Sequence, residues 1–290
     1  MKAFGPAFVG LTGSTAQIQD AEKKYNLIKA FAVEHPDRAG LAYSPADVRR
    51  LAAQGKFAVA ISLLNAYPLG SDLAQIDEWY KRGVRIFGYV HAGHNDWADS
   101  SRPNKNLGNA VEEHGGLSSI GKQGIARLND VGILIDVSQL STPAFKQVLS
   151  LTRAPVAATH SGIKAIVDVT RNLSDEELEL IKKNGGVVQI VAFSNYLRPA
   201  PEGGQAAPAT VAQLVNTIDY AVKKIGIDHV GIASDFNHGG GVAGWQNEGE
   251  APNVTVELLR RGYSERDIGK LWGGNFLRVW GEAQKAAKAR

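Results

Sequence analysis

The sequence predicts an α/β protein, and more specifically a (β/α)8 barrel of the TIM type. Short apolar runs alternate along the chain with longer helical patterns, which is the order of repeated parallel strand and helix units. The runs are apolar at nearly every position, as in strands covered on both faces. Polar residues follow many different strands, and a barrel gathers all its strand ends around one mouth. An open doubly wound sheet with a single crevice remains the alternative.

The expected elements alternate in chain order, and several helices carry start and stop signals. Ser174 and the acids that follow it predict a helix start, and Asn184-Gly185 predicts its end. The expected strands are Phe8–Leu11, Leu41–Tyr43, Phe57–Leu63, Arg85–Val90, Ile133–Val137, Val156–Thr159, Gly186–Ala192 and His229–Ala233. The expected helices include Thr15–Val33, Ser71–Arg82, Leu117–Asp130, Pro143–Leu151 and Ser174–Lys183.

Length and composition indicate one domain that covers residues 1–290. An α/β barrel typically needs about 250 residues, so the 290 residues of this chain fit one such domain. The chain is 44% hydrophobic and 21% charged, which is the balance of a globular protein with an ample core. It has no internal repeats, and the loop-like stretch 199–208 is too short to link two domains.

Charge and composition argue against several classes of partner. The net charge of +3 is spread along the chain without a basic block, so nucleic acid is not expected as a partner. No stretch approaches the roughly 20 apolar residues of a membrane span. The absence of cysteine excludes disulfides, thiolate zinc sites and cysteine nucleophiles. The start MKAFGPAFVG lacks a signal-peptide pattern. We therefore expect a soluble protein, either cytoplasmic or, where a signal peptide has been removed, periplasmic or secreted.

Several residues at strand ends are candidates for chemistry. His91 in YVHAGHNDWADS and His160 in ATHSG each follow a strand directly, where a histidine can bind metal, transfer protons or simply bond to nearby backbone. Asp235 precedes a glycine-rich turn that leaves room for a ligand. Arg171, in a loop before a helix, offers a guanidinium suited to a carboxylate, although it could equally form a surface salt bridge. Asn65 also follows a strand and is a candidate for substrate binding.

Other polar residues have simpler explanations. His94, Asp96 and Asp99 fit a polar turn, and His229 at a strand start is expected to be structural. The GxSxG motif of serine hydrolases does not occur. Hydrolysis at a metal or polar centre in the barrel mouth is therefore the better general hypothesis.

Six ordered motifs together resemble the membrane (renal) dipeptidase family. They are GVRIFGYVHAGHNDWADS, GGLSSIGKQGIARLNDVGILIDVSQLS, APVAATHSG, TRN, DHVGIASDFNHGG and GGNFLRVW, and the resemblance runs from about Pro36 to the C-terminus. It implies a (β/α)8 barrel with two zinc ions at the mouth and hydrolysis of dipeptides. Many members of that family are homodimers, so a homodimer is one expected assembly.

The resemblance assigns roles residue by residue. His160 matches a histidine ligand of the second metal, and His91 matches the histidine that stabilises the tetrahedral intermediate. Arg171 matches the arginine that grips an oxygen of substrate or intermediate, and Asp235 matches the carboxylate near the metal and the substrate amine. The expected substrate-binding residues are His91, Arg171, Asn65 and Asn237.

The metal ligands depart from the family pattern. The position of the glutamate that bridges the two metals is Leu64, and the position of a partner histidine is Gln139. Asn237 stands where the family commonly has a second aspartate. No His-x-Asp pair, which the family carries on its first strand, occurs in the first 34 residues. Of the five expected ligands only His160 remains, because a carboxamide is a weak zinc ligand and a leucine is none.

Three explanations are open. The His-x-Asp segment could lie outside this chain, whose barrel would then lack its first strand. An otherwise intact enzyme could carry a substitution at Leu64, with Gln139 tolerated by a modified metal site. The chain could also be a pseudoenzyme that binds dipeptide-like small molecules without cleaving them.

The expected function is dipeptide hydrolysis by metal-activated water, with zinc as the cofactor. The expected catalytic residues are His91, Asp235 and Arg171. The binding protein without catalysis is the alternative, motivated by Leu64, Gln139 and the absent His-x-Asp pair.

Overall fold

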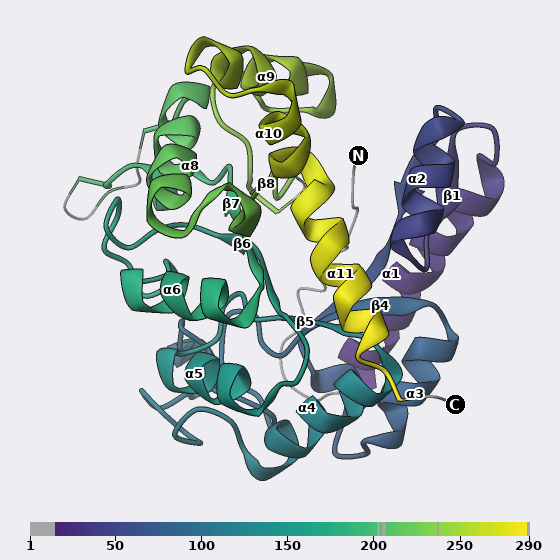
Figure 1. Ribbon diagram of the computed structural model, residues 1–290. Coiled ribbons are helices and arrows are strands. Elements are labelled where there is room, and N and C mark those ends of the chain that lie inside the picture. Colours follow the sequence, from purple (N-terminus) through teal and green to yellow (C-terminus); the bar gives the residue numbers. More distant parts are fainter. Residues whose placement is uncertain (1–14, 202–203, 205–206, 237, 289–290) are drawn as a thin grey trace. The chain divides into compact units, whose positions relative to one another are not determined.

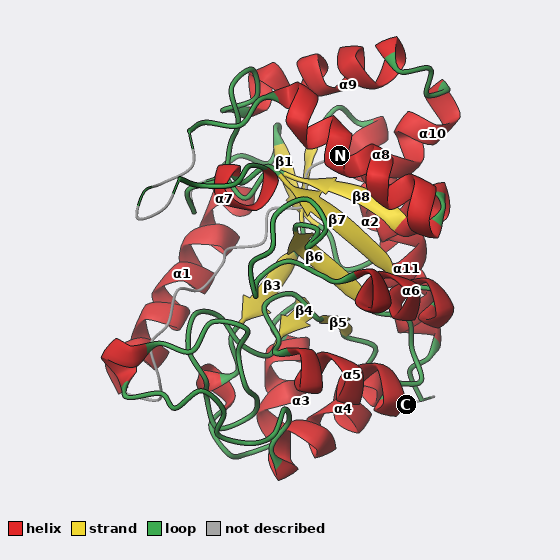
Figure 2. Ribbon diagram, turned by 90° about the vertical axis from the view of Figure 1, so that its left-hand side faces the viewer, coloured by secondary structure: helices red, strands yellow, loops and turns green. Residues whose placement is uncertain are grey.

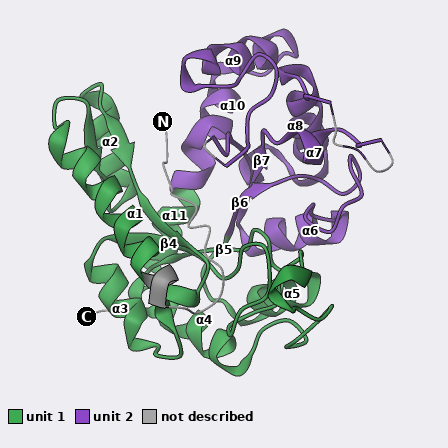
Figure 3. Cartoon of the chain, turned by 180° about the vertical axis from the view of Figure 1, so that it is seen from behind, with its two compact units in different colours: residues 1–156, 278–290 green, residues 157–277 purple. Residues whose placement is uncertain are grey.

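The computed structural model describes residues 15–201, 204, 207–236 and 238–288. The chain divides into two compact units, shown in different colours in Figure 3 and described separately here. Unit 1 comprises residues 1–156 and 278–290, and unit 2 comprises residues 157–277. The expectation of a single domain over residues 1–290 stays a prediction.

Unit 1 consists of parallel strands connected by helices (Figure 1). Strand β1 pairs with β2, and β4 pairs with both β3 and β5. The strands are β1 (Ala39–Leu41), β2 (Phe57–Val59), β3 (Ile61–Leu64), β4 (Val84–Gly88) and β5 (Leu134–Asp136). The helices are α1 (Thr15–Glu34), α2 (Pro45–Ala53), α3 (Ala74–Lys81), α4 (Ser119–Val131) and α5 (Thr142–Leu151), with 3-10 turns η1 (Tyr67–Leu69) and η2 (Lys105–Leu107).

Unit 2 repeats the pattern, and its strands are among the yellow arrows of Figure 2. Strand β7 pairs in parallel with β6 and β8. The strands are β6 (Ala157–Ser161), β7 (Val187–Val191) and β8 (Val230–Ala233). The helical segments are α6 (Asp175–Asn184), α7 (Ser194–Leu197), α8 (Val211–Ile225), η3 (Ile227–His229), η4 (Glu248–Glu250), α9 (Ala251–Arg260), α10 (Glu265–Gly269), the π-helical η5 (Lys270–Gly274) and the start of α11 (Asn275–Lys285).

Side-chain caps explain where helices begin and end. At the start of α6, Ser174 Oγ accepts from the Glu177 N–H at 3.2 Å, and the Ser174 N–H donates to Glu177 Oε2 at 2.8 Å. This reciprocal pair is a capping box, and Gly185 ends the helix in the left-handed conformation at φ 79°. The start and end predicted for this helix are confirmed.

The predicted α/β fold with parallel strands is confirmed, and the strands β5 and β7 are buried on both faces. All three residues of β5 are buried, as are four of the five in β7. The expected strand Phe57–Leu63 forms two strands, because the chain changes partner at Ala60: β2 pairs with β1, and β3 pairs with β4. The expected strand Phe8–Leu11 lies outside the described residues. Among the helices that the structure describes, none is long and apolar enough to cross a membrane.

Arg82 joins α1 to the end of α3. Its guanidinium carbon lies 4.1 Å from the ring centroid of Tyr25 and 3.9 Å from that of Trp79. Its two terminal nitrogens donate to the two carboxylate oxygens of Glu22 at 2.5 and 2.6 Å. The hydrogen bond from Arg82 lowers the pKa of Glu22 below its usual value. Cation–π contact and a two-pronged ion pair thus act together at this helix junction.

Arg82→Ala is expected to lower the free energy of unfolding by about 1–2 kcal/mol, because it removes both ring contacts and the partner of Glu22. The pKa of Glu22 is lower in the folded state than in the unfolded state. The ion pair with Arg82 therefore stabilises the fold fully above the usual glutamate pKa of about 4.3, and this contribution is lost as the pH falls through the pKa of the folded state. Urea unfolding at neutral pH and at about pH 3 should show the difference between the two proteins shrinking in acid. Lys81→Ala, which removes only an exposed ion pair, is the matched control and should change stability by less than about 0.5 kcal/mol.

Candidate functional site

The carboxyl ends of three strands of unit 1 place Leu64, Gly88 and Asp136 in one row. In the parallel register Leu64 pairs with Gly88, and Gly88 pairs with Asp136. A Cβ atom added to Gly88 would lie 2.7 Å from Leu64 Cδ1 and 3.7 Å from Asp136 Oδ2. The side chains of Leu64 and Asp136 therefore flank Gly88 on the same face of the strands.

Leu64 fills the space that the missing side chain of Gly88 leaves. It is 5% exposed, and its Cδ1 approaches so closely that even a methyl group at position 88 would require it to move. A leucine side chain has no atom that can donate an electron pair to a cation. The position that the resemblance gives to a bridging glutamate is thus an apolar packing position here.

The turn after β5 is organised by a buried carboxylate. Asp136 is 4% exposed, and its Oδ1 accepts from the Ser138 N–H at 2.9 Å. A carboxylate that bonds to its own backbone two residues on closes an Asx turn. The chain then continues into Gln139, which has a positive φ of 70°.

Gln139 is held from the side by the loop that follows β4. Its Oε1 accepts from Arg102 Nη2 at 2.7 Å, and its backbone carbonyl accepts from the Ser101 N–H at 2.8 Å. Ser100 Oγ lies 3.4 Å from that carbonyl oxygen. Gln139 is 3% exposed, whereas Arg102 is partly exposed. The position given to a partner histidine therefore carries a carboxamide whose oxygen faces a guanidinium.

Asn65 lies directly after β3 and is fixed by Asn95. Asn95 Nδ2 donates to Asn65 Oδ1 at 2.7 Å and to the Tyr89 carbonyl at 2.6 Å. Asn95 Oδ1 accepts from the N–H groups of Trp97 and Ala98 at 2.8 and 3.1 Å. Both ends of the Asn95 carboxamide are therefore committed, and the orientation of Asn65 depends on them.

Three non-glycine residues have positive φ in the part of the chain that the structure describes: Asn65 (109°), Gln139 (70°) and Asp235 (53°). Each follows the carboxyl end of a strand within three residues, namely β3, β5 and β8. Side-chain-bearing residues seldom adopt this conformation, and such strain gathers at functional sites. The backbone thus marks the same strand ends that the sequence analysis selected.

His91 follows β4 as expected and is partly exposed. Its carbonyl oxygen accepts from Ser100 Oγ at 2.5 Å, so the loop that starts at His91 folds back on itself. The Gly93 N–H donates to the Arg102 carbonyl at 2.9 Å and closes the same loop. The catalytic role of the His91 side chain stays a prediction.

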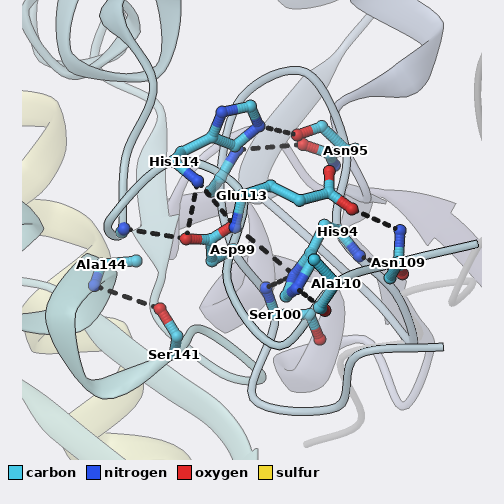
Figure 4. Close-up of polar contacts among 12 residues, drawn as sticks. His94, Asn95, Asp99, Ser100, Asn109, Ala110, Glu113, His114, Ser141 and Ala144 are labelled. Atoms are coloured by element: carbon cyan, nitrogen blue, oxygen red, sulfur yellow. Dashed lines mark hydrogen bonds and ion pairs between the residues drawn. The ribbon is translucent and has the colours of Figure 1, made fainter. Parts of the chain in front are cut away.

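His94 and Asp99 form a structural network inside this loop, drawn in Figure 4. The Ser100 N–H donates to His94 Nδ1 at 2.9 Å, so Nδ1 is the unprotonated nitrogen, and Nε2 donates to the Ala110 carbonyl at 3.1 Å. Asp99 accepts from the N–H groups of Glu113, His114 and Gly116. Both side chains are almost fully buried. The simpler explanation, a polar turn, is supported for these residues.

Two buried tyrosines lie close to the same strand ends. Burial raises the pKa of Tyr67 to about 12, and the charge of Asp20 adds to the effect. Burial also raises the pKa of Tyr89, whose hydroxyl donates to the Gly121 carbonyl at 3.2 Å. Both phenols stay protonated near neutral pH, so neither can act as a base there.

In unit 2, Arg171 is anchored at the end of β6. It is 4% exposed, its Nη1 donates to Ser161 Oγ at 3.2 Å, and its Nη2 donates to the His160 carbonyl. Its guanidinium carbon lies 5.5 Å from the ring centroid of Tyr196. His160 Nδ1 lies 2.8 Å from Thr159 Oγ1. The structure therefore brings the His160 backbone and the Arg171 side chain together.

Asp235 begins a tight turn after β8. Its carbonyl accepts from the N–H groups of His238 and Gly240 at 3.2 and 3.0 Å. A Cβ at Gly240 would lie 2.2 Å from the Ser234 carbonyl oxygen, so only glycine fits there. Asn237 lies outside the described residues. The roles proposed for Asp235 and Asn237 stay predictions.

The donor set does not fit the two-zinc site that the resemblance implies. Leu64 contributes no ligand atom, and Gln139 Oε1 already accepts from a cation. Over the residues that the structure describes, no three His, Asp or Glu side chains are grouped so that they could hold a metal ion. Zinc requires several such nitrogen, oxygen or sulfur ligands around one point.

Arg102 is the residue that the sequence analysis missed. It lies two residues beyond the motif that ends at Ser100, and it meets Gln139 across 37 positions of sequence. The spacing of residues in the sequence predicts which side chains are neighbours on one helix or strand. It does not predict a contact between two loops.

Comparisons with known proteins agree on one family. A family model described as membrane dipeptidase, peptidase family M19, matches residues 3–290. The crystal structure of the probable dipeptidase PvdM from Pseudomonas aeruginosa is similar, with 45% identity, a TM-score of 0.94, and coverage of 98% of this chain and 86% of that one.

Curated proteins that are similar to this chain are also named dipeptidases, and they are longer than it. Dipeptidase aclJ of Aspergillus oryzae is 30% identical over 275 residues, which cover 94% of this chain and 63% of that protein. Dipeptidase tcpJ of Claviceps purpurea is 29% identical over 279 residues, which cover 95% of this chain and 62% of that protein. The chain thus spans less than two thirds of the length of these relatives.

Gly88→Ala is expected to lower the free energy of unfolding by about 1–3 kcal/mol, because the new methyl group meets Leu64 Cδ1. Combining it with Leu64→Ala should cost less than the sum of the two single changes, by at least about 0.5 kcal/mol, since the smaller side chain removes the clash. Urea unfolding of the four proteins measures this coupling.

The control is Gly269→Ala, where nothing lies within 4 Å of the added atom, and no destabilisation is expected. Strictly additive effects of Gly88→Ala and Leu64→Ala would contradict the packing of Leu64 over Gly88.

Proposed function

The chain belongs to the membrane dipeptidase family, and we propose that it binds dipeptide-like small molecules without the family's two-metal hydrolysis. The observation that carries this proposal is the packing of Leu64 over Gly88 at the carboxyl end of β3. Two cations close together need an anionic bridging group to offset their repulsion, and an apolar side chain in that position cannot supply it.

The ligand class comes from the family and from the residues that match it. Arg171, buried and anchored to Ser161 and to the His160 carbonyl, would grip an oxygen of the ligand. A guanidinium held in one orientation recognises carbonyl and carboxylate oxygens with little loss of side-chain freedom. Asp235, in the same unit as Arg171, would contact the amine of the ligand.

Hydrolysis is the second candidate, and one observation favours it. His160 Nδ1 lies 2.8 Å from Thr159 Oγ1, the kind of outer contact that orients metal-ligating histidines. If the remaining ligands were supplied in another way, zinc would polarise the scissile carbonyl and activate a water molecule. His160 by itself cannot hold two zinc ions.

Calorimetric titration of the purified chain with a panel of dipeptides is expected to show binding, with no turnover and no stoichiometric zinc after zinc loading and gel filtration. Arg171→Ala should weaken binding of every dipeptide by at least about tenfold, because a charge-assisted contact is lost. Arg198→Ala is the matched control, because Arg198 is an exposed arginine of the same unit. This variant should bind dipeptides with the affinity of the wild type.

Because Arg171 is buried, Arg171→Lys provides a second variant. It keeps the positive charge but loses the planar guanidinium that can donate two parallel hydrogen bonds. Thermal unfolding of both variants separates loss of binding from loss of structure. Stoichiometric zinc together with turnover that a chelator abolishes would contradict the proposal and establish hydrolysis instead.

A further inference from the structure

His94 is a buried histidine whose two ring nitrogens have different hydrogen-bond roles (Figure 4). Its Nδ1 accepts from the Ser100 N–H at 2.9 Å, and its Nε2 donates to the Ala110 carbonyl at 3.1 Å. A backbone N–H only donates and a carbonyl only accepts, so both bonds require the tautomer with its proton on Nε2. The His94 side chain is 0% exposed, so water cannot replace either bond. His94 therefore completes this network only in its neutral form.

Asp99 gives the protonated form of His94 a second partner. Its Oδ1 lies 3.6 Å from His94 Nδ1, which is beyond hydrogen-bond distance but close enough for attraction between opposite charges. A protonated Nδ1 carries a hydrogen atom and cannot accept from the Ser100 N–H. A shift of less than about 1 Å would bring Nδ1 within hydrogen-bond distance of the Asp99 oxygen. One ring nitrogen thus has two alternative partners, and its proton decides between them.

The exchange of partners would loosen the loop at two points. Asp99 Oδ1 already accepts from the N–H groups of Glu113 and His114 at 3.1 and 3.2 Å. A protonated His94 competes with these N–H groups for the same oxygen. It also leaves the N–H of Ser100, a buried residue, without its acceptor, and such groups are costly to leave unpaired.

The neighbouring ionisable groups Glu113 and His114 respond differently to acid. Glu113 Oε1 accepts from Asn109 Nδ2 at 3.0 Å, and Asn109 Oδ1 in turn accepts from the backbone N–H of His94 at 2.9 Å. His114 Nε2 lies 2.8 Å from the Asn95 carbonyl oxygen and therefore donates to it. That bond persists in either protonation state of His114, because a proton gained at Nδ1 leaves the Nε2–H in place. His114 is thus a histidine of the same network without the conflict found at His94.

The loop connects His94 to the end of β4. Ser100 Oγ donates to the His91 carbonyl at 2.5 Å, so a change at Ser100 reaches the residue that follows β4. Arg102, the cation nearest along the chain, donates to Gln139 Oε1 at 2.7 Å. The other charged side chains of the loop are exposed, namely Asp96, Lys105 and Glu112.

We propose that protonation of His94 opens the loop of residues 91–116, which is closed near neutral pH and open in acid. A proton from solvent binds to Nδ1, the hydrogen bond from the Ser100 N–H breaks, and a bond from Nδ1–H to Asp99 Oδ1 forms. Histidine is the side chain that changes charge most readily between about pH 5 and 8. The inference goes beyond the proposed function and holds whether the chain hydrolyses its ligand or only binds it.

Amide hydrogen exchange of the full chain, followed by mass spectrometry at about pH 5 and about pH 7.5, tests the proposal. After correction for the intrinsic exchange rate, protection of peptides from residues 91–116 should fall at least about tenfold at the lower pH. Peptides from α4 report unfolding of the unit as a whole and should keep their protection, which distinguishes local opening from a general loss of stability.

His94→Asn places a carboxamide oxygen near the position of Nδ1, so it accepts from the Ser100 N–H and does not titrate. Its protection should agree at the two pH values within about twofold. His114→Gln is the matched control, because the glutamine Nε2 also donates to the Asn95 carbonyl, and it should retain the tenfold fall of the wild type. Thermal unfolding near neutral pH verifies that both variants fold.

Nitrogen-15 chemical shifts of the His94 ring in the wild type keep the test valid if His94→Asn does not fold. They should show a proton on Nε2 alone near neutral pH and protons on both nitrogens in acid. A proton on Nδ1 near neutral pH, or a neutral ring at about pH 5, would overturn the proposal. So would equal protection of the wild type at both pH values, or a fall in His94→Asn as large as in the wild type.

Discussion

The parallel register of β3, β4 and β5 is the constraint on which the candidate site of unit 1 depends. It pairs Leu64 with Gly88 and Gly88 with Asp136, and so determines which side chains share a face at the carboxyl ends. A slip of one residue would turn Leu64 to the opposite face of the strands. Because Gly88 has no side chain, Leu64 can pack over it. An apolar side chain therefore occupies the carboxyl end of β3.

The loop after β4 depends on a second constraint, the need to satisfy buried backbone N–H groups. Asp99 accepts three of them, and His94 and Asn95 bind others, so most polar residues of this loop are used to hold its shape. Buried polar groups without partners would destabilise the loop. The result is a rigid support that places Arg102 against Gln139.

The two constraints together determine which side chains meet at the carboxyl ends of β3, β4 and β5. A site for two zinc ions is built from groups that donate electron pairs, such as carboxylates and neutral histidines. Leu64 offers no such group, and Gln139 Oε1 accepts a hydrogen bond from Arg102. The groups present at this strand end therefore differ from the metal ligands that the family motifs imply.

The sequence by itself determined the class of fold and the strand ends that matter. Apolar runs and capping signals such as Ser174 and Gly185 depend on neighbouring residues, so they could be recognised without a structure, and the ordered motifs indicated the family. Leu64 and Gln139 were also found in advance as departures from those motifs. Only the tertiary structure decided what surrounds them. The contact of Leu64 with Gly88 depends on strand register, and that of Gln139 with Arg102 joins two loops 37 residues apart. Such contacts are set by the packing of the whole unit, and local sequence patterns carry no information about them.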